Sequence, residues 1–165
     1  MKKYLYIMIT ALAFISLSCD KDDTDPGRTS VEEMAGDWWV TYEYEDNGKW
    51  HDSGVGHQRF TTYNTAANSD SEMWINDGEH FWEFSGIVSV DYTNKTFTSN
   101  GMIDNVTYES QFEITDGKVL KDGALTPSGQ PADSIVFYVK FDDDTDNILW
   151  KVSGFRRSGF PADDF

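Results

Sequence analysis

Residues 36–49 read GDWWVTYEYEDNGK and combine the pattern of a β-strand with that of a tight turn. From residue 38 to residue 44 every even position carries Trp, Val or Tyr, whereas positions 41, 43 and 45 carry Thr or Glu. Because successive side chains of a strand point to opposite faces, this alternation predicts a strand with one buried face. The Asn47-Gly48 pair that follows favours a hairpin turn, since both residues tolerate positive φ angles.

The same alternation recurs along the rest of the chain. It is clearest at residues 80–92, 106–114, 135–141 and 148–152, with shorter runs at 59–63, 72–75, 96–99 and 118–125. Turn signals such as Asn76-Asp77-Gly78 and Asp116-Gly117 separate these runs. The pattern predicts an all-β fold of roughly eight to ten antiparallel strands in a meander of hairpins. Closure into a β-barrel removes exposed sheet edges and is the preferred arrangement, with a β-sandwich as the alternative.

The first residues resemble the signal peptide of a bacterial lipoprotein. Lys2 and Lys3 precede an apolar segment, residues 4–17, that is too short to span a bilayer readily. The segment ends in Ser16-Leu17-Ser18-Cys19, which resembles the lipobox at which a signal peptidase cuts before cysteine. Cys19 is the only cysteine of the chain, so no internal disulfide can form. We expect residues 1–18 to be removed and Cys19 to carry the lipid that anchors the protein in a membrane.

The residues after Cys19 indicate a destination. Lys21, Asp22 and Asp23 resemble the surface-export signal of Bacteroidota lipoproteins, in which a Lys and two acids follow the lipid-bearing cysteine. An acidic run near a terminus is also typical of a solvated tether, and the two interpretations are compatible. We therefore expect residues 19–30 to form an acidic tether and residues 31–165 to form one domain. The expected location is the outer membrane, with the protein exposed at the cell surface.

The charge of the chain disfavours two classes of partner. The whole chain has a formal net charge of −16, from 13 basic and 29 acidic residues. Removal of residues 1–18 takes away two of the basic residues, Lys2 and Lys3, and none of the acidic ones, so the charge becomes −18. Such a surface repels nucleic acid and anionic lipid headgroups, and neither is an expected partner.

Gly36-Asp37-Trp38 resembles the Gly-x-Trp element that opens the barrel of lipocalin-like proteins. In those proteins the Trp closes one end of the barrel, and an Arg from near the last strand packs over it. Arg156 and Arg157 follow the last predicted strand, and either guanidinium can cover the Trp38 indole by a cation–π contact. We assign barrel closure to Gly36, Trp38 and Arg157.

A longer resemblance covers nearly the whole chain after the signal peptide. The chain is similar to a family of surface lipoproteins described as lipid-binding putative hydrolases. The segments that carry the likeness are FTTYNTAAN (60–68), MWIND (73–77), FWEF (81–84) and GFRRSGF (154–160), followed by Asp163-Asp164. Ser158 stands where this pattern often has Thr. The resemblance implies a compact, lipocalin-like β-barrel with an apolar ligand, and it carries no catalytic residues over to this chain.

The residues expected inside the barrel point to a place for that ligand. Trp82 and Phe84 share the inward parity of residues 80–92 and lie close to the small residue Gly86. Small residues beside large ones predict a modest cavity with aromatic walls, which suits a small apolar or amphipathic ligand such as a fatty acyl chain. We expect His80 and Arg156 near the mouth, where they would meet the polar head of the ligand.

Two other functions stay open. A non-enzymatic glycan-binding or accessory role would use the aromatic residues that the alternation does not send to the core, which are Trp39, Trp50, Trp74 and Phe81. An esterase-type hydrolase would need an activated serine, yet the chain has no Gly-x-Ser-x-Gly element. His51 and His57 flank a glycine-rich segment, but adjacency in sequence does not make a triad. The sequence therefore favours a binding protein over an enzyme.

The sequence predicts no metal site and no cofactor. Residues 142–147 read DDDTDN and resemble the start of a calcium loop. Asn147 stands where such a loop needs Gly, and Ser153 stands where it needs a bidentate Glu. One cysteine and three separated histidines do not form a zinc pattern.

Overall fold

The computed structural model describes residues 27–165, and the regular structure of this part of the chain consists of strands. A ring of eight strands forms a barrel: β1 (Gly36–Asp46), β3 (Gln58–Asn64), β4 (Glu72–Asn76), β5 (Ser85–Asp91), β6 (Thr96–Thr98), β8 (Gln111–Leu125), β9 (Pro131–Phe141) and β10 (Trp150–Arg156). Two short strands extend the sheet, β2 (Lys49–Asp52) beside β1 and β7 (Ile103–Asp104) beside β8. Among the described residues, no helix is long and apolar enough to cross a membrane.

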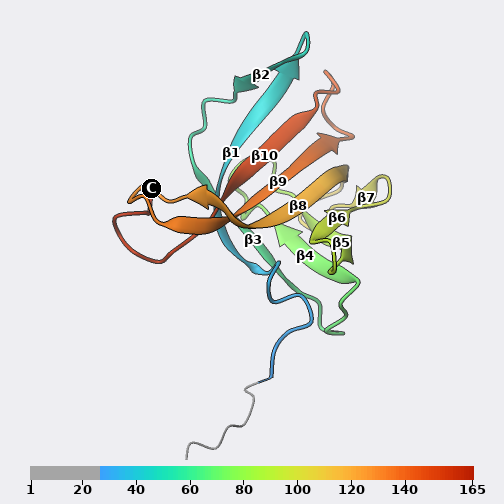
Figure 1. Cartoon of the computed structure of the whole chain (residues 1–165). Coiled ribbons are helices and arrows are strands. Elements are labelled where there is room, and N and C mark those ends of the chain that lie inside the picture. The colour runs from blue at the N-terminus through green and yellow to red at the C-terminus, as the bar shows by residue number, and fades with distance from the viewer. Residues whose placement is uncertain (1–26) are drawn as a thin grey trace, which may run out of the picture.

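The ring closes where β1 pairs with β10 (Figure 1). The antiparallel register of this pair runs from Trp38 opposite Arg156 to Tyr44 opposite Trp150. On its other edge β1 pairs with β3 and then, closer to its end, with β2. The predicted closed antiparallel barrel is confirmed. A sandwich of two packed sheets is excluded because a single sheet closes on itself.

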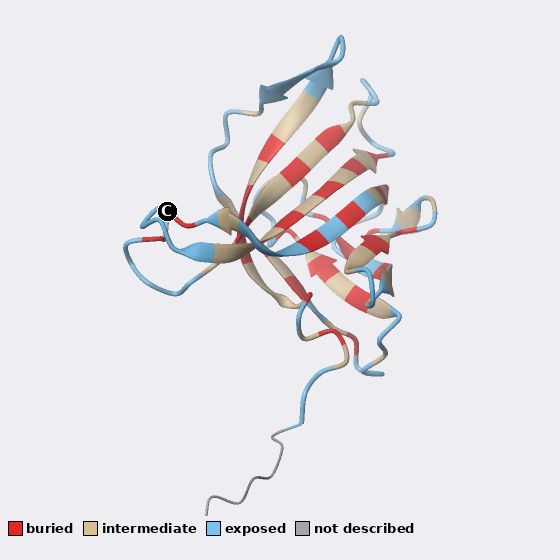
Figure 2. Ribbon diagram, viewed as in Figure 1, coloured by how far each residue is buried: buried red, intermediate tan, exposed pale blue. Residues whose placement is uncertain are grey.

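The alternation of the sequence separates the inside of the barrel from the outside. Along β9 the odd positions from 135 to 141 are buried and the positions between them are half-buried, and Figure 2 shows this striping on the neighbouring strands as well. Glu43, Glu113 and Lys140, at predicted outward positions, are half-buried, and Glu83 is exposed. The interior is filled by large, fully buried side chains, among them Trp38, Tyr42, Phe60, Phe84, Phe112 and Phe137.

The seam between β1 and β10 depends on two glycines. Gly154 pairs with Val40, and a Cβ atom at residue 154 would collide with the carbonyl oxygen of Trp39. A Cβ atom at Gly36 would lie 2.6 Å from Nη1 of Arg156. Glycine at these positions therefore lets the first strand of the barrel meet the last and leaves room for the Arg156 side chain.

Residues 80–92 do not form one strand, contrary to the sequence prediction. β5 begins at Ser85, and the residues before it form a connection that we call the 77–84 loop. The Asp77 carboxylate accepts hydrogen bonds from the backbone N–H groups of Glu79 (3.0 Å), Phe81 (3.2 Å) and Trp82 (2.9 Å). A side chain that binds backbone N–H groups in this way competes with strand pairing. Alternation alone therefore mispredicts this segment.

A second difference lies at Asp116-Gly117, which the sequence predicts as a hairpin turn. Residues on both sides of this pair bond to β9, so the chain continues as one long β8 with a bulge. Asp116 adopts a φ of 52°, and the absent side chain of Gly117 makes room for Phe97. Residues 106–110, predicted as the start of this strand, precede it, because β8 begins at Gln111.

Replacing Trp38 by alanine should lower the free energy of unfolding by about 3–5 kcal/mol, the range for a large buried aromatic side chain. The indole is fully buried and its N–H donates to Thr62 Oγ1 (2.9 Å), so packing and a hydrogen bond are lost together. Trp74→Ala, at a half-buried outward position of β4, is the matched control and should cost much less. Urea unfolding followed by circular dichroism measures both variants. Equal losses would contradict the interior position of Trp38.

Candidate functional site

The barrel has two chemically different ends. At one end β1 begins and β10 finishes, and residues 30–35 cover the interior. At the other end β1 finishes and β10 begins, and the 77–84 loop covers the interior with Phe81 stacked on Tyr42. We call the first the arginine end and the second the aromatic end.

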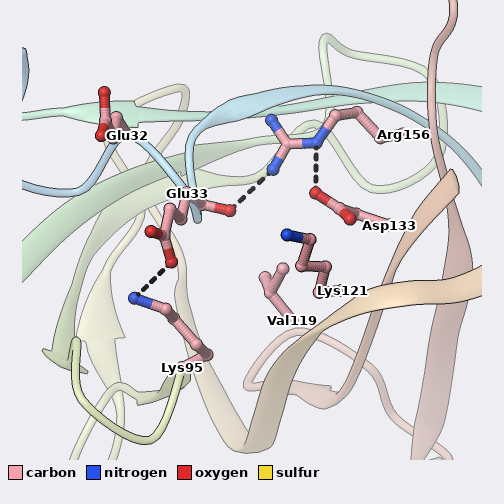
Figure 3. A pocket seen from close by; sticks show the side chains of 7 residues that line it. All are labelled: Glu32, Glu33, Lys95, Val119, Lys121, Asp133 and Arg156. Carbon is pink, nitrogen blue, oxygen red and sulfur yellow. Dashed lines mark hydrogen bonds and ion pairs between the residues drawn. The ribbon is translucent and has the colours of Figure 1, made fainter.

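At the arginine end, Arg156 lies over Trp38, with the guanidinium carbon 4.6 Å from the ring centroid. Its Nε donates to the Asp133 carboxylate (3.1 Å) and its Nη2 to the Glu33 carbonyl oxygen (2.7 Å), as Figure 3 shows. Its Nη1 donates to the carbonyl oxygen of Ala35. All three nitrogens of the guanidinium are therefore bound to the barrel and its cover.

This geometry corrects the assignment of Arg157 to barrel closure. The register places residue 156 opposite Trp38, so these two side chains share a face, and the next residue points to the other face. Arg157 lies 5.9 Å from the ring of Trp39 and donates to Asp164 from Nε (2.7 Å) and Nη2 (2.5 Å). It therefore fastens the C-terminal residues to the outside of the barrel.

A hollow of about 440 Å³ opens beside Arg156 (Figure 3). It is lined by the acids Glu32, Glu33 and Asp133, the bases Lys95, Lys121 and Arg156, and Val119. Lys95 Nζ lies 2.8 Å from Glu33, and Arg156 is bound to Asp133, so most of these charges pair with one another. The side chains of this hollow are therefore mostly charged, and several of them are bound to one another.

The aromatic end gathers rings around the 77–84 loop. Phe81 stacks on Tyr42 with ring centroids 4.0 Å apart and meets Trp150 edge-on at 4.8 Å. Trp82 stacks on Phe141 at 4.7 Å. Phe81 and Trp82 are only half-buried, and together with two other side chains they line a hollow of about 370 Å³. Aromatic surface is therefore accessible at this end.

One carboxylate holds the rim of this hollow. Asp143, in the connection between β9 and β10, accepts hydrogen bonds from Trp82 Nε1 (3.0 Å) and from the Tyr108 hydroxyl (2.7 Å). The acidic residues 142–147 thus position aromatic side chains. Across residues 27–165 no group of three or more His, Cys, Asp or Glu side chains is placed to hold a metal ion.

Two buried polar atoms next to Phe81 have no hydrogen-bond partner among the described residues. They are the hydroxyl of Tyr42, which is fully buried, and Nε1 of Trp150, a residue that is 9% exposed. An unpaired buried polar group costs about 1–3 kcal/mol of folding free energy. Burial raises the pKa of Tyr42 well above its usual value, and the charge of Asp77 acts in the same direction. The phenol therefore stays protonated and can donate a hydrogen bond.

Asp77 is a fully buried acid at this end. Burial raises its pKa, while hydrogen bonds from the backbone N–H groups of Trp82, Glu79 and Phe81 oppose that shift. These donors all belong to the 77–84 loop. The conformation of the loop and the buried carboxylate therefore depend on each other.

The residues predicted to bind a ligand do not all lie together. His80, Trp82 and Phe84 belong to the 77–84 loop, whereas Arg156 lies at the arginine end. Phe84 is fully buried and His80 is exposed, so Trp82 is the one of these three that offers ring surface to the hollow. Of the two residues predicted to meet the polar head of the ligand, His80 thus lies in the same loop as Trp82, and Arg156 lies at the opposite end of the barrel.

The cavity expected beside Gly86 is already filled. The Phe112 ring and the Ile103 side chain would lie 2.9 and 3.2 Å from a Cβ atom at this position.

The sequence did not single out Tyr42 and Trp150, because alternation shows them only as core positions of their strands. The sequence does contain a signal for the 77–84 loop. It is Asn76-Asp77-Gly78, because an acid ahead of a glycine can bind the backbone of the following loop.

The histidines form no hydrolase site in the part of the chain that the structure describes. His51 stacks on Tyr44 with centroids 5.3 Å apart, and His57 stacks on Phe165 at 3.7 Å. Within residues 27–165 none of the three imidazole rings makes a hydrogen bond to a serine or a carboxylate. A nucleophile and a base in contact are therefore not assembled among these residues.

The predicted lipidation residue Cys19 and the predicted export residues Lys21, Asp22 and Asp23 lie outside the described residues. The same holds for the signal peptide and for most of the tether. These features stay predictions from the sequence.

Comparison with known proteins gives a family match and a similar solved structure. The sequence model of a family described as "Lipid-binding putative hydrolase" matches residues 23–161. No curated protein matches the chain. A solved structure of a protein of unknown function from Bacteroides ovatus is similar at 11% identity, with a TM-score of 0.47, over 79% of this chain and 43% of that one. This chain thus spans less than half the length of that protein.

The C-terminal contact of Arg157 should make stability depend on pH. Hydrogen bonds from Arg157 and Trp39 lower the pKa of Asp164 from 3.8 to about 2. A carboxyl whose pKa is lower in the folded state stabilises the fold above its unfolded pKa, and this contribution is lost as the pH falls through the folded pKa. Between about pH 5 and pH 2, wild type should lose more unfolding free energy than Asp164→Asn. Urea titrations at both pH values give the difference, and an identical pH dependence of the two proteins would disprove the contact.

Proposed function

Because the chain belongs to the family of lipid-binding putative hydrolases, we propose that it binds an amphipathic lipid at the aromatic end of its barrel. The observation that carries this proposal is the half-buried pair Phe81 and Trp82 beside a hollow of about 370 Å³. Apolar walls with a few polar atoms are typical of small-molecule sites. At the arginine end the lining side chains are charged apart from Val119, and no aromatic ring lines the hollow.

The packing of the core sets the depth of the site. Phe60 is fully buried and contacts Phe137 and Phe84 with ring centroids 5.2 and 5.9 Å apart. A barrel of about eight strands has room either for its own side chains or for one small ligand. Here side chains take that room. The acyl chain therefore lies across the aromatic end, against Trp82, and not along the barrel axis.

The charge of the chain limits the headgroup. A net charge of −16 repels anionic lipids over distances of about a Debye length. The proposed ligand is accordingly uncharged or zwitterionic at its polar end.

The proposed location is the outer membrane, with a lipid on Cys19 and the barrel exposed at the cell surface. Support comes from the lipobox-like sequence before Cys19 and from the export-like Lys21-Asp22-Asp23. The described chain enters the barrel at the arginine end, where residues 30–35 precede β1 (Figure 1). An anchor on that side directs the aromatic end away from the membrane, where it can take lipid from the surroundings.

A glycan-binding or accessory role is the second candidate, and one observation favours it. Tyr63, which is 39% exposed, stacks on Trp74 with ring centroids 6.1 Å apart on the outer face of β3 and β4. Parallel rings of this kind can pack against the apolar face of a sugar. The third candidate, an esterase, draws on the family description alone, since no serine–histidine pair is assembled in the described chain.

The lipid proposal predicts stoichiometric uptake of monodecanoylglycerol by the full-length protein. Trp82→Ala should weaken this binding roughly tenfold or more, because the indole is the largest of the three rings that line the hollow. Isothermal titration calorimetry measures the affinity, and native mass spectrometry of protein purified from its producing cells identifies lipids already bound.

Trp74→Ala is the matched control, since it removes an indole from the outer face, and its affinity for the lipid should equal that of wild type. Release of decanoate during the titration would favour the esterase. Absence of acyl binding, together with oligosaccharide binding that Trp74→Ala abolishes, would favour the glycan-binding candidate.

The proposed location predicts two separable losses. Cys19→Ala should abolish labelling by a fatty-acid probe and release the protein from the membrane fraction. Replacement of Lys21, Asp22 and Asp23 by alanine should preserve labelling but shield the protein from protease added to whole cells. Labelled Cys19→Ala protein would refute lipidation at this residue. Unchanged proteolysis of the triple variant would mean that the acidic segment is only a tether and not an export signal.

A further inference from the structure

We infer that the 77–84 loop covers a polar subsite in which the Tyr42 hydroxyl and Trp150 Nε1 donate hydrogen bonds to the carbonyl oxygen of an uncharged acyl ester or amide. The inference rests on the proposed function and names the headgroup that the aromatic end recognises. When the ligand binds, Phe81 moves away from Tyr42 and Trp150, and the carbonyl group takes its place.

The two donors lie on adjacent strands and belong to rings that contact the same phenyl group. Tyr42 lies on β1 and Trp150 on the adjacent β10, opposite Tyr44. Phe81 contacts both rings, at 4.0 and 4.8 Å between centroids. Nearly all buried polar groups of proteins are hydrogen-bonded. Two buried donors without a partner in residues 27–165, both against the same phenyl ring, therefore indicate a site for an acceptor from outside the chain.

The loop that carries Phe81 can move without breaking the barrel. Asn76 pairs with Ser85, and the Asp77 N–H donates to the Phe84 carbonyl oxygen (3.1 Å), so residues 78–83 lie outside the ladder of β4 and β5. Glu79 and Glu83 adopt φ angles of 63° and 50°, a region that side chains with a Cβ rarely occupy. Hydrogen bonds to the Asp77 carboxylate hold this conformation. Asp143 and Asn105 bind the loop at Trp82 and at the Glu83 carbonyl oxygen, but no such contact holds the Phe81 side chain, which only packs against other rings.

The chemistry around the donors selects an uncharged acceptor. The acids Asp77, Glu83 and Asp143 belong to the cover and its rim. Lys151, on the same strand as Trp150, is bound on the outer face by Glu43 at 2.6 Å. Neutral donors close to acids favour an ester or amide carbonyl over a carboxylate. The acids would repel a carboxylate, and no cation at the donors would compensate for the hydration that the carboxylate loses.

Tyr42→Phe tests the inference because it removes one hydroxyl and keeps the ring. The variant should unfold at a urea concentration no lower than that of wild type, since an unpaired buried hydroxyl is lost. Its affinity for decanamide should nevertheless fall about tenfold, the effect of one hydrogen bond. A purely structural role of Tyr42 would not lower affinity while preserving stability.

Three comparisons complete the design, all with the full-length protein and isothermal titration calorimetry. Tyr92→Phe, which removes a hydroxyl at the arginine end beside Lys95, should match wild type. Phe81→Ala should bind decanamide more tightly than wild type, because no ring has to be displaced. Decanoate, which differs from decanamide at one headgroup and carries a charge at neutral pH, should bind wild type at least about tenfold more weakly.

Equal affinity of wild type and Tyr42→Phe for decanamide would overturn the inference, and so would equal affinity of wild type for decanoate and decanamide. In either case, uptake that still depends on Trp82 leaves the proposed function standing. If wild type binds none of the decanoyl compounds, the proposed function itself is refuted, and the inference with it.

Discussion

The pairing of β1 with β10 is the constraint on which the remaining structure depends. It removes both edges of a sheet that would otherwise stay open to other chains. The same register places Trp38 opposite Arg156 at one end and Tyr44 opposite Trp150 at the other, so a single pair of strands builds both ends of the barrel. Gly154 makes the close approach possible, since any side chain there would collide with the backbone of β1.

A filled interior moves the chemistry of this barrel to its ends. The buried aromatic side chains supply the packing that a chain without a disulfide needs, and they leave the axis without room for a ligand. What distinguishes the two ends is then the cover. Residues 30–35 and Arg156 close one end with paired charges, whereas the 77–84 loop closes the other with half-buried rings above unpaired donors. Binding at the proposed site accordingly requires the 77–84 loop to move and leaves the strands in place.

Patterns of period two predicted most of the strands and their inward residues, because burial on one face dictates every second side chain. The prediction of a closed barrel came from the need to remove sheet edges and from the family resemblance. They failed where a side chain binds the backbone or where a strand bends. The Asp77 carboxylate binds the N–H groups of Glu79, Phe81 and Trp82, so these groups do not pair in the sheet. Asp116 and Gly117 form a bulge in place of a turn. Arg156 and Arg157 were indistinguishable in sequence, since only the register with Trp38 decides which one faces inward. The unpaired donors depend on three-dimensional contacts that no local pattern encodes.

The order of the strands around the ring has a consequence for folding. The sequential neighbours β3 to β6 and β8 to β10 can pair as hairpins as soon as they exist, but β1 must wait for β10, the last strand of the chain. Contacts between residues far apart in sequence carry a large loop-closure entropy and form slowly. We therefore expect closure of the ring to be a late step of folding. Until β10 pairs with β1, both strands are open edges that can pair with other chains.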